Sequence, residues 1–389
     1  MPIHDGEPMA ELADNDDGFE VAHEDVLRGL SIDEVEAEEA KARDEVRDNN
    51  GIDSTELNTM EAQPAGVLEP PTKIVGYRIE PAGEPQDRRH KYYAVDLETD
   101  RKFYIAFVAH YPRSNPKRKG LATSRGPMVF DRFAEEERLG LWAHFMWPSV
   151  TAEGNGNHLV INTYDRARFT WGFYQLAAHT ADDNLILLTR ELLKLDTAAF
   201  FFPDLALDDH GKVARKTSSG LKTLENKVYS RQHHEYQIPD FMAYMNPVSR
   251  RVENEEVLNA AKFIDWAQRD PQMLAETVKV SFHIMRKKVR SWAKTYGLVG
   301  RRPELAIWIS DMHHQGRARG SASKIRRALS KPTFEQQMDS LSRIDSTGSQ
   351  SARISKVKQR IQTLIDEKRF DGVEFGKGVL SLESDDYKS

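Results

Sequence analysis

The chain has 389 residues, of which 39% are hydrophobic and 30% are charged, and its formal net charge is −6. This length suffices for one large or two modest domains with a sizeable core. The absence of cysteine excludes disulfides, thiolate catalysis and cysteine-based zinc sites. No apolar run approaches the roughly 18 residues that a membrane helix needs, so we expect no membrane partner.

Charge is distributed unevenly along the chain. Residues 1–70 contain 21 Asp and Glu against 4 Lys and Arg, whereas the remainder has 40 acidic and 51 basic residues. The first segment has too little apolar surface to offset its ordering entropy, which predicts a disordered acidic tail over 1–70. Such a tail can bind a delivery or chaperone partner, or simply keep the protein soluble. The basic remainder favours an anionic polymer as partner.

The N-terminal 20 residues are acidic and contain no apolar stretch, so we expect no secretory signal peptide. We therefore expect synthesis in the cytoplasm. A cell-wall target would then be reached after lysis or through a non-classical export route.

Alternating β-branched and aromatic residues over 73–110 predict a small β-meander with a hairpin turn at 98–100. A basic, proline-containing loop should follow, which gives a small β-rich subdomain with its linker over 71–120. The larger domain, 121–375, shows mainly helical periodicity, and a second disordered tail is expected over 376–389. The strand signals in this larger domain are 158–162 and, more weakly, 170–175.

The helices expected in the larger domain share apolar residues at three- and four-residue spacing. The first should stop at Pro148, because proline lacks the N–H that a helix interior uses. The expected helices are 129–147, 184–195, 257–270, 271–297, 304–315, 321–330 and 352–369.

The segment 151–175, TAEGNGNHLVINTYDRARFTWGFYQ, contains a pattern that suits hydrolysis of a glycosidic bond. Glu153 and Asp165 are separated by a polar stretch, and Asp165 is followed by Thr170, Trp171 and Gly172. Such hydrolysis needs one carboxylic acid that protonates the leaving oxygen and a second carboxylate that activates water or attacks.

This segment also resembles a known family. The stretches AEGNGN, YDRARFTWGFYQ, DDNLILLTRELLKLD and FFPDLAL are similar to the catalytic segment of bacterial chitosanases, and phage-type lysozymes share the order Glu, Asp, Thr-x-Gly. AIWISDMHHQGR, at 306–317, is a looser match. The resemblance implies a mostly α, lysozyme-like α+β domain with a small β-wing at the cleft. It also implies that Glu153 is the general acid, Asp165 the base and Thr170 the residue that positions water.

Two departures bear on the substrate. The family's Gly-Arg-Gly-Tyr is Arg-Ala-Arg-Phe here, and the spacing from Glu153 to Asp165 lies between those of the chitosanases and the phage lysozymes. The polar stretch 154–164 can place the two carboxyl groups far enough apart for an intervening water. This arrangement predicts an inverting reaction.

Five further residues are candidates for substrate binding. Arg166 and Arg168 flank Asp165, so they can favour its ionised form or hold substrate carboxylates. A role as solvated surface residues suits them equally. Adjacent histidines at 313 and 314 lack the i,i+4 spacing of two metal ligands on one helix face. No metal and no cofactor is therefore expected. The candidates are Arg166, Arg168, Gln175, His179 and His314.

Three functions remain open from the sequence. The excess of basic residues in 71–389 suits peptidoglycan, which carries carboxylates, better than it suits the polycation chitosan. A muramidase-like enzyme is therefore the leading hypothesis. The alternatives are a chitosanase and a non-catalytic component that binds the cell wall or belongs to a phage or injection system. The sequence has no nucleotide-binding or serine-hydrolase motif, and no recognisable nucleic-acid motif accompanies its basic clusters.

Overall fold

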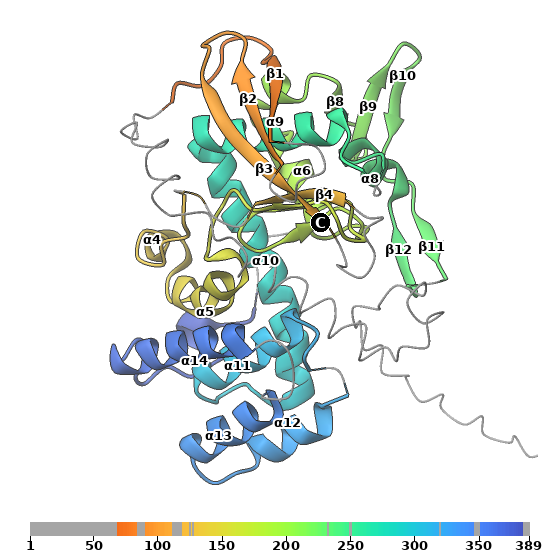
Figure 1. The fold of residues 1–389 in the computed structure, drawn as a ribbon. Coiled ribbons are helices and arrows are strands. Elements are labelled where there is room, and N and C mark those ends of the chain that lie inside the picture. The colour runs from red at the N-terminus through yellow and green to blue at the C-terminus, as the bar shows by residue number, and fades with distance from the viewer. Residues whose placement is uncertain are drawn as a thin grey trace, which may run out of the picture.

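The computed structural model describes residues 68–83, 90–110, 119–123, 126, 128–231, 233–248, 251–318, 320–345 and 351–383. Nearly all of the predicted tail 1–70 and most of the predicted loop 111–120 lie outside these residues. The described part is a mixed α+β fold with antiparallel sheets (Figure 1). No helix in these ranges is both long enough and apolar enough to cross a membrane.

A seven-stranded sheet runs from the N-terminal meander into the candidate site. Its strands are paired in sequence order and are β1 (Tyr77–Ala82), β2 (Lys91–Asp96), β3 (Lys102–His110), β4 (Lys119–Thr123), β5 (Ile161–Asn162), β6 (Thr170–Trp171) and β7 (Leu176–Ala177). β1–β3 form the meander that the alternation predicts. Ala122 of β4 pairs with Asn162 of β5, so one sheet spans both segments.

Two smaller antiparallel sheets were not predicted. One contains β8 (Leu205–Leu207), β9 (Val213–Thr217) and β10 (Gly220–Thr223), and the other contains β11 (Val228–Ser230) and β12 (Glu235–Gln237). The expectation that strands in this half are confined to 158–162 and 170–175 is therefore wrong. These strands are short and mostly exposed, so they lack the apolar alternation on which strand prediction depends.

The helices surround one large hydrophobic core, and Ala109, Ala122 and Tyr164 form a second, small cluster among the described residues. The predicted helices from residue 184 onwards correspond to observed ones. The predicted helix 129–147 is divided between α4 and α5, and α7, α8 and α13 were not predicted. The described helices are α4 (Glu136–Leu139), α5 (Trp142–Gly154), α6 (Leu185–Leu192), α7 (Ala198–Phe201), α8 (Pro239–Met245), α9 (Asn254–Arg269), α10 (Pro271–Tyr296), α11 (Pro303–His314), α12 (Ala322–Leu329), α13 (Phe334–Asp345) and α14 (Ser351–Asp366).

Helix α5 does not stop at Pro148 as predicted but continues to Gly154. Phe145, Met146 and Val150 are each at most 2% exposed, so this helix is held by packing on both sides of the proline. Burial of several large side chains outweighs the loss of one backbone hydrogen bond, which costs about 3 kcal/mol in a helix interior.

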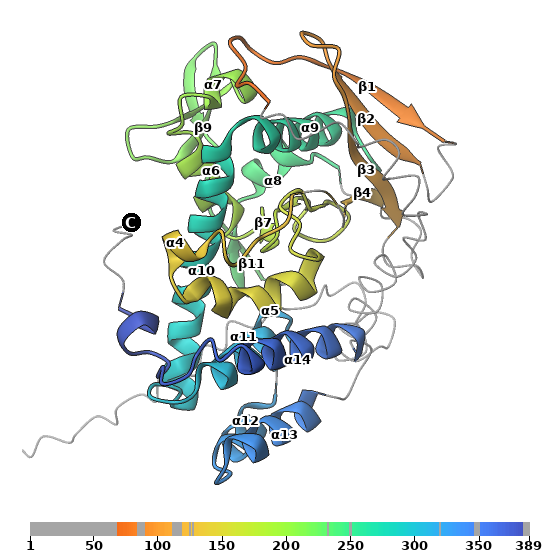
Figure 2. The ribbon, with the colours of Figure 1, turned by 90° about the vertical axis from the view of Figure 1, so that its left-hand side faces the viewer.

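Helix α10, with 26 residues and a length of about 39 Å, runs through the molecule. The seven-stranded sheet and α9 lie towards one of its ends, and α11–α14 lie towards the other (Figures 1 and 2). Residues 376–383, assigned to a tail from the sequence, include the 3₁₀ turn Gly378–Leu380. Leu380 and Leu382 are buried, and Arg290 of α10 donates to the Leu382 carbonyl, so this end packs on the body.

A buried ion network joins α11 to α14. Asp311 is fully buried, and its carboxylate accepts hydrogen bonds from Arg353 at 2.7 Å and from Arg317. Arg317 also pairs with Asp345 at the end of α13. Although burial alone would raise it, the pKa of Asp311 lies below its usual value because of these guanidinium groups.

Arg353→Met should lower the free energy of unfolding by roughly 3–5 kcal/mol, because it leaves the buried Asp311 carboxylate without one of its two cations. Lys194→Met removes an exposed i,i+3 pair with Glu191 and should cost less than about 0.5 kcal/mol. Urea denaturation of both variants provides the measurement. Equal losses of unfolding free energy in the two variants would show that the buried ion network does not stabilise the packing of α11 against α13 and α14.

Candidate functional site

Asp165 lies in the turn between β5 and β6. One of its carboxylate oxygens, Oδ1, accepts a hydrogen bond from the backbone N–H of Ala167 at 2.9 Å. The other, Oδ2, accepts one from the side-chain amide of Asn162 at 3.1 Å. Asp165 is half-buried. Two donors thus fix the orientation of this carboxylate before any ligand binds.

Thr170 is brought to the same place by strand pairing. It is the direct partner of Asn162 in the β5–β6 pair and is 4% exposed. Directly opposed residues in an antiparallel pair place their side chains on one face of the sheet. Asn162 therefore connects Asp165, through its amide, with Thr170, through the strand register.

Glu153 is the penultimate residue of α5. Its side chain lies outside the described residues. The backbone beside it is closely packed, because a Cβ added at Gly154 would lie 2.8 Å from Cγ2 of Val160. The end of α5 is thus in contact with Val160, the residue that precedes β5. The backbone of Glu153 therefore lies close to the β5–β6 pair.

Arg166 and His179 meet at a residue that the sequence did not single out as a binding residue. Arg166 pairs with the Glu235 carboxylate at 3.2 Å, and Nε2 of His179 lies 3.7 Å from the same oxygen. The side-chain amide of Gln237 also donates to it at 2.7 Å. The hairpin β11–β12 therefore covers this side of the turn and neutralises part of its positive charge.

His179 is uncharged at neutral pH. Its pKa lies well below the usual value, first because it is buried and then because Arg166, His233 and Lys288 place positive charge near it. Its contact with Glu235 is consequently a contact of a neutral ring with a carboxylate. A neutral imidazole can donate one proton in a hydrogen bond and accept another.

The other three candidate binding residues lie on the margins of this site. Gln175 donates from its side chain to the Gly172 carbonyl at 3.0 Å, so it closes its own turn. Arg168 has a φ of 60°, and its carbonyl accepts a hydrogen bond from Asn246. His314, at the end of α11, stacks on Tyr174 with 4.7 Å between ring centroids. The segment 306–317 is thus in contact with the β6–β7 turn.

Two buried residues hold the Asp165 turn from beneath. The side-chain amide of Asn246 donates to the carbonyls of Thr163 and Arg168, the two ends of the turn, at 3.3 and 3.0 Å. Glu256 of α9 accepts hydrogen bonds from the Thr163 hydroxyl and, at 3.2 Å, from the Leu121 N–H. Burial raises the pKa of Glu256 to about 8 despite these donors.

Asn246 and Glu256 were not predicted as members of this site. The only signal was local: Glu253 and Glu256 have the three-residue spacing of a capping box, which the structure contains at the start of α9. That spacing predicts the beginning of a helix. It gives no information about the long-range contacts with Thr163 and Leu121.

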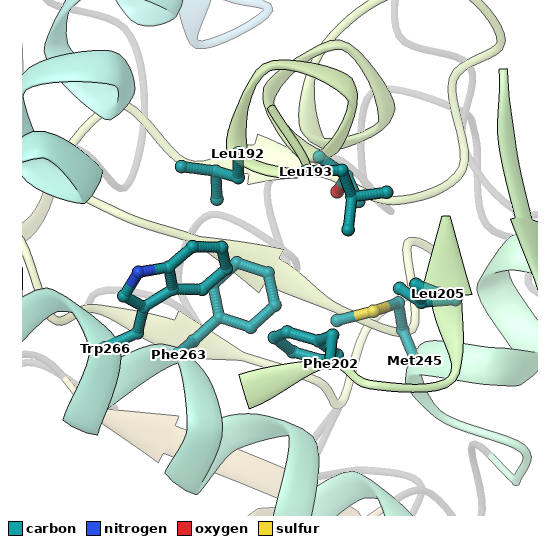
Figure 3. Close-up of a pocket in the computed structure, with 8 residues that line it drawn as sticks. Leu192, Leu193, Phe202, Leu205, Met245, Phe263 and Trp266 are labelled. Atoms are coloured by element: carbon teal, nitrogen blue, oxygen red, sulfur yellow. The ribbon is translucent and has the colours of Figure 1, made fainter. Parts of the chain in front are cut away.

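An apolar pocket between α6 and α9 is a feature of the core and not of this site (Figure 3). Thr189 is its one hydroxyl-bearing residue, and that hydroxyl donates to the Leu185 carbonyl. A sugar needs several polar partners, so this pocket does not suit one. Its lining residues are Thr189, Leu192, Leu193, Phe202, Leu205, Met245, Phe263 and Trp266.

No family model, no curated protein and no solved structure matches this chain.

The raised pKa of Glu256 predicts a pH dependence of stability. Because this carboxyl group keeps its proton to a higher pH when folded, the unfolded chain binds fewer protons between about pH 4.5 and 8, and stability should fall as pH rises through that window. Glu256→Gln mimics the protonated acid and should remove this slope. At pH 8 the variant should be about 4 kcal/mol more stable than the parent, and near pH 4.5 the two should be similar.

Urea denaturation at several pH values provides the measurement. Glu255→Gln is the matched control, because Glu255 is the exposed neighbour on the same helix turn. Parallel stability curves for the parent and Glu256→Gln would show that Glu256 ionises normally in the folded protein.

Proposed function

We propose that this protein is a lysozyme-like glycoside hydrolase that cleaves β-1,4 bonds of an amino-sugar polymer, with peptidoglycan as the favoured substrate. Glu153 is the general acid, Asp165 is the base and Thr170 helps to position water. The observation that carries the proposal is the placement of Asn162, which fixes the Asp165 carboxylate and is the strand partner of Thr170.

The local architecture gives further support. The short strands β5, β6 and β7 follow directly on the helix that contains Glu153, and the resemblance implies strands beside the acid helix. Here these strands are the last three of the seven-stranded sheet and not a separate wing. Asn246 and Glu256 hold the intervening turn with buried hydrogen bonds. A catalytic carboxylate gains from such a rigid support, because the reacting groups must be kept in position.

The proposed reaction proceeds in one displacement. Glu153 transfers its proton to the glycosidic oxygen as the bond from that oxygen to the anomeric carbon breaks. Asp165 takes a proton from a water molecule, whose oxygen forms the new bond to the anomeric carbon from the opposite face. The products are two shorter chains, one with a new hydroxyl group at an inverted anomeric carbon.

Charge favours peptidoglycan over chitosan as substrate. Arg166, Lys287 and Lys288 all lie near His179 or its neighbour Asp183. Arg166 is paired with Glu235, Lys287 lies 3.6 Å from Asp183, and burial lowers the pKa of Lys288, so these residues give little excess positive charge. The preference for peptidoglycan therefore rests on the net basic charge of residues 71–389, which attracts a polymer with carboxylates and repels a polycation.

Glu153→Gln and Asp165→Asn should each reduce the release of soluble fragments from purified sacculi by at least about 100-fold, because each removes a proton-transfer group. Asp196→Asn, which changes an exposed acid elsewhere, should leave the rate unchanged. Thermal unfolding of all three should stay close to that of the parent. More than about a tenth of the parent activity in either site variant would remove that residue from the mechanism.

The first product released should carry the inverted anomer, as proton NMR of the reaction mixture will report, because a water lies between Asp165 and the sugar in this mechanism. A retained anomer would make Asp165 a nucleophile. Parallel assays on chitosan distinguish the two substrates. Binding to sacculi without turnover of either polymer would contradict the enzyme and support a non-catalytic wall-binding protein.

A further inference from the structure

The positive charge of the body is concentrated in one segment of the chain. Residues 271–331 contain 14 Lys and Arg against 3 Asp and Glu, whereas 71–270 and 332–389 together contain 37 of each sign. The whole excess of positive charge after residue 70 therefore belongs to the segment that forms α10, α11 and α12.

Part of this charge forms an exposed surface without acidic partners. The residues are exposed, and no described Asp or Glu lies within ion-pair distance of them. Arg326 reaches α10, since it donates to the Thr295 carbonyl at 3.4 Å and lies 5.9 Å from the Tyr296 ring centroid. We call this set the α10–α12 basic surface: Arg290, Lys294, Lys324, Arg326, Arg327 and Lys331.

The basic surface lies at the end of α10 remote from the seven-stranded sheet, beside α12 (Figures 1 and 2). It is connected with the candidate site along α10. Lys287, one turn before Arg290, pairs with Asp183, and the charge of Lys288 lowers the pKa of His179.

The chain itself contains a matching polyanion. Residues 1–67 have 20 Asp and Glu against 4 Lys and Arg, and the first 27 residues have 9 acids and no Lys or Arg. Covalent connection gives this segment a high effective concentration at the body. Sixty-seven residues can extend to roughly 220 Å, several times the length of α10, so the distance along the body is no obstacle.

We propose that the acidic segment 1–67 docks on the α10–α12 basic surface and shields it from external polyanions. The segment's charge of −16 exceeds the +6 of the surface, so docking neutralises the surface fully. The contact is between solvent-exposed charges, and salt should therefore weaken it strongly. The proposal concerns regulation of access and stands whether or not the protein hydrolyses a glycan.

The chain's lack of cysteine makes a direct distance test practical. A fluorophore pair on Ala22→Cys and Ser323→Cys reports the distance from the acidic segment to α12. Ser218→Cys, in the β9–β10 hairpin, replaces Ser323→Cys in the control pair. In full-length protein at low salt, energy transfer for 22–323 should exceed that for 22–218, and 0.5 M NaCl should abolish the difference.

Two sets of four substitutions with equal charge change test the surface itself. The first set neutralises the basic surface: Lys294→Gln, Lys324→Gln, Arg326→Gln and Arg327→Gln. It should reduce the energy transfer between positions 22 and 323 to the value measured between positions 22 and 218. The control set, Lys222→Gln, Arg231→Gln, Lys356→Gln and Lys358→Gln, changes exposed residues elsewhere and should leave transfer unchanged. Circular dichroism checks that both sets are folded.

Inorganic polyphosphate serves as an external probe in the same assay. It should compete with the acidic segment for the basic surface and so lower the energy transfer between positions 22 and 323. The proposal is overturned if transfer is equal for the two pairs and insensitive to salt, or if both sets of substitutions have the same effect. It is also overturned if polyphosphate binds through the basic surface without changing transfer, because the surface would then serve an external polyanion only.

Discussion

Two buried carboxyl groups on α9, those of Glu256 and Asp265, fasten the seven-stranded sheet to the helical body. Asp265 accepts a hydrogen bond from Tyr77 of β1 at 2.8 Å and pairs with Arg101, just before β3. Glu256 reaches β4 and the residue after β5. Because buried polar groups without partners are costly, α9 and the sheet can pack only in the register that satisfies both carboxyl groups.

This constraint determines the geometry of the candidate site. Thr163 contacts Glu256 with its hydroxyl group and Asn246 with its carbonyl, and it lies between Asn162 and the Asp165 turn. Movement of α9 would therefore change the orientation of the Asp165 carboxylate. The raised pKa of Glu256 indicates that the fold tolerates a destabilising buried acid here. Such a cost is expected where a turn must be held rigidly for function.

Charge is organised on a larger scale than any one contact. The buried networks around Asp265 and Asp311 combine acids with arginines, whereas α10 and α12 carry exposed cations without acidic partners among the described residues. The first kind of charge specifies packing, because it is desolvated. The second kind acts at longer range, and the proposed docking of the acidic segment depends on it.

The sequence by itself determined the elements whose signal is local. Alternation predicted β1–β3, helical periodicity predicted α6 and α9–α12, and the order of Glu153, Asp165 and Thr170 identified the turn. Only the tertiary structure decided that α5 continues through Pro148, that β11–β12 brings Glu235 to Arg166, and that Glu256 supports the turn. The reason is physical: these outcomes depend on burial and hydrogen bonds between residues up to 135 positions apart, which leave no periodic trace in either segment.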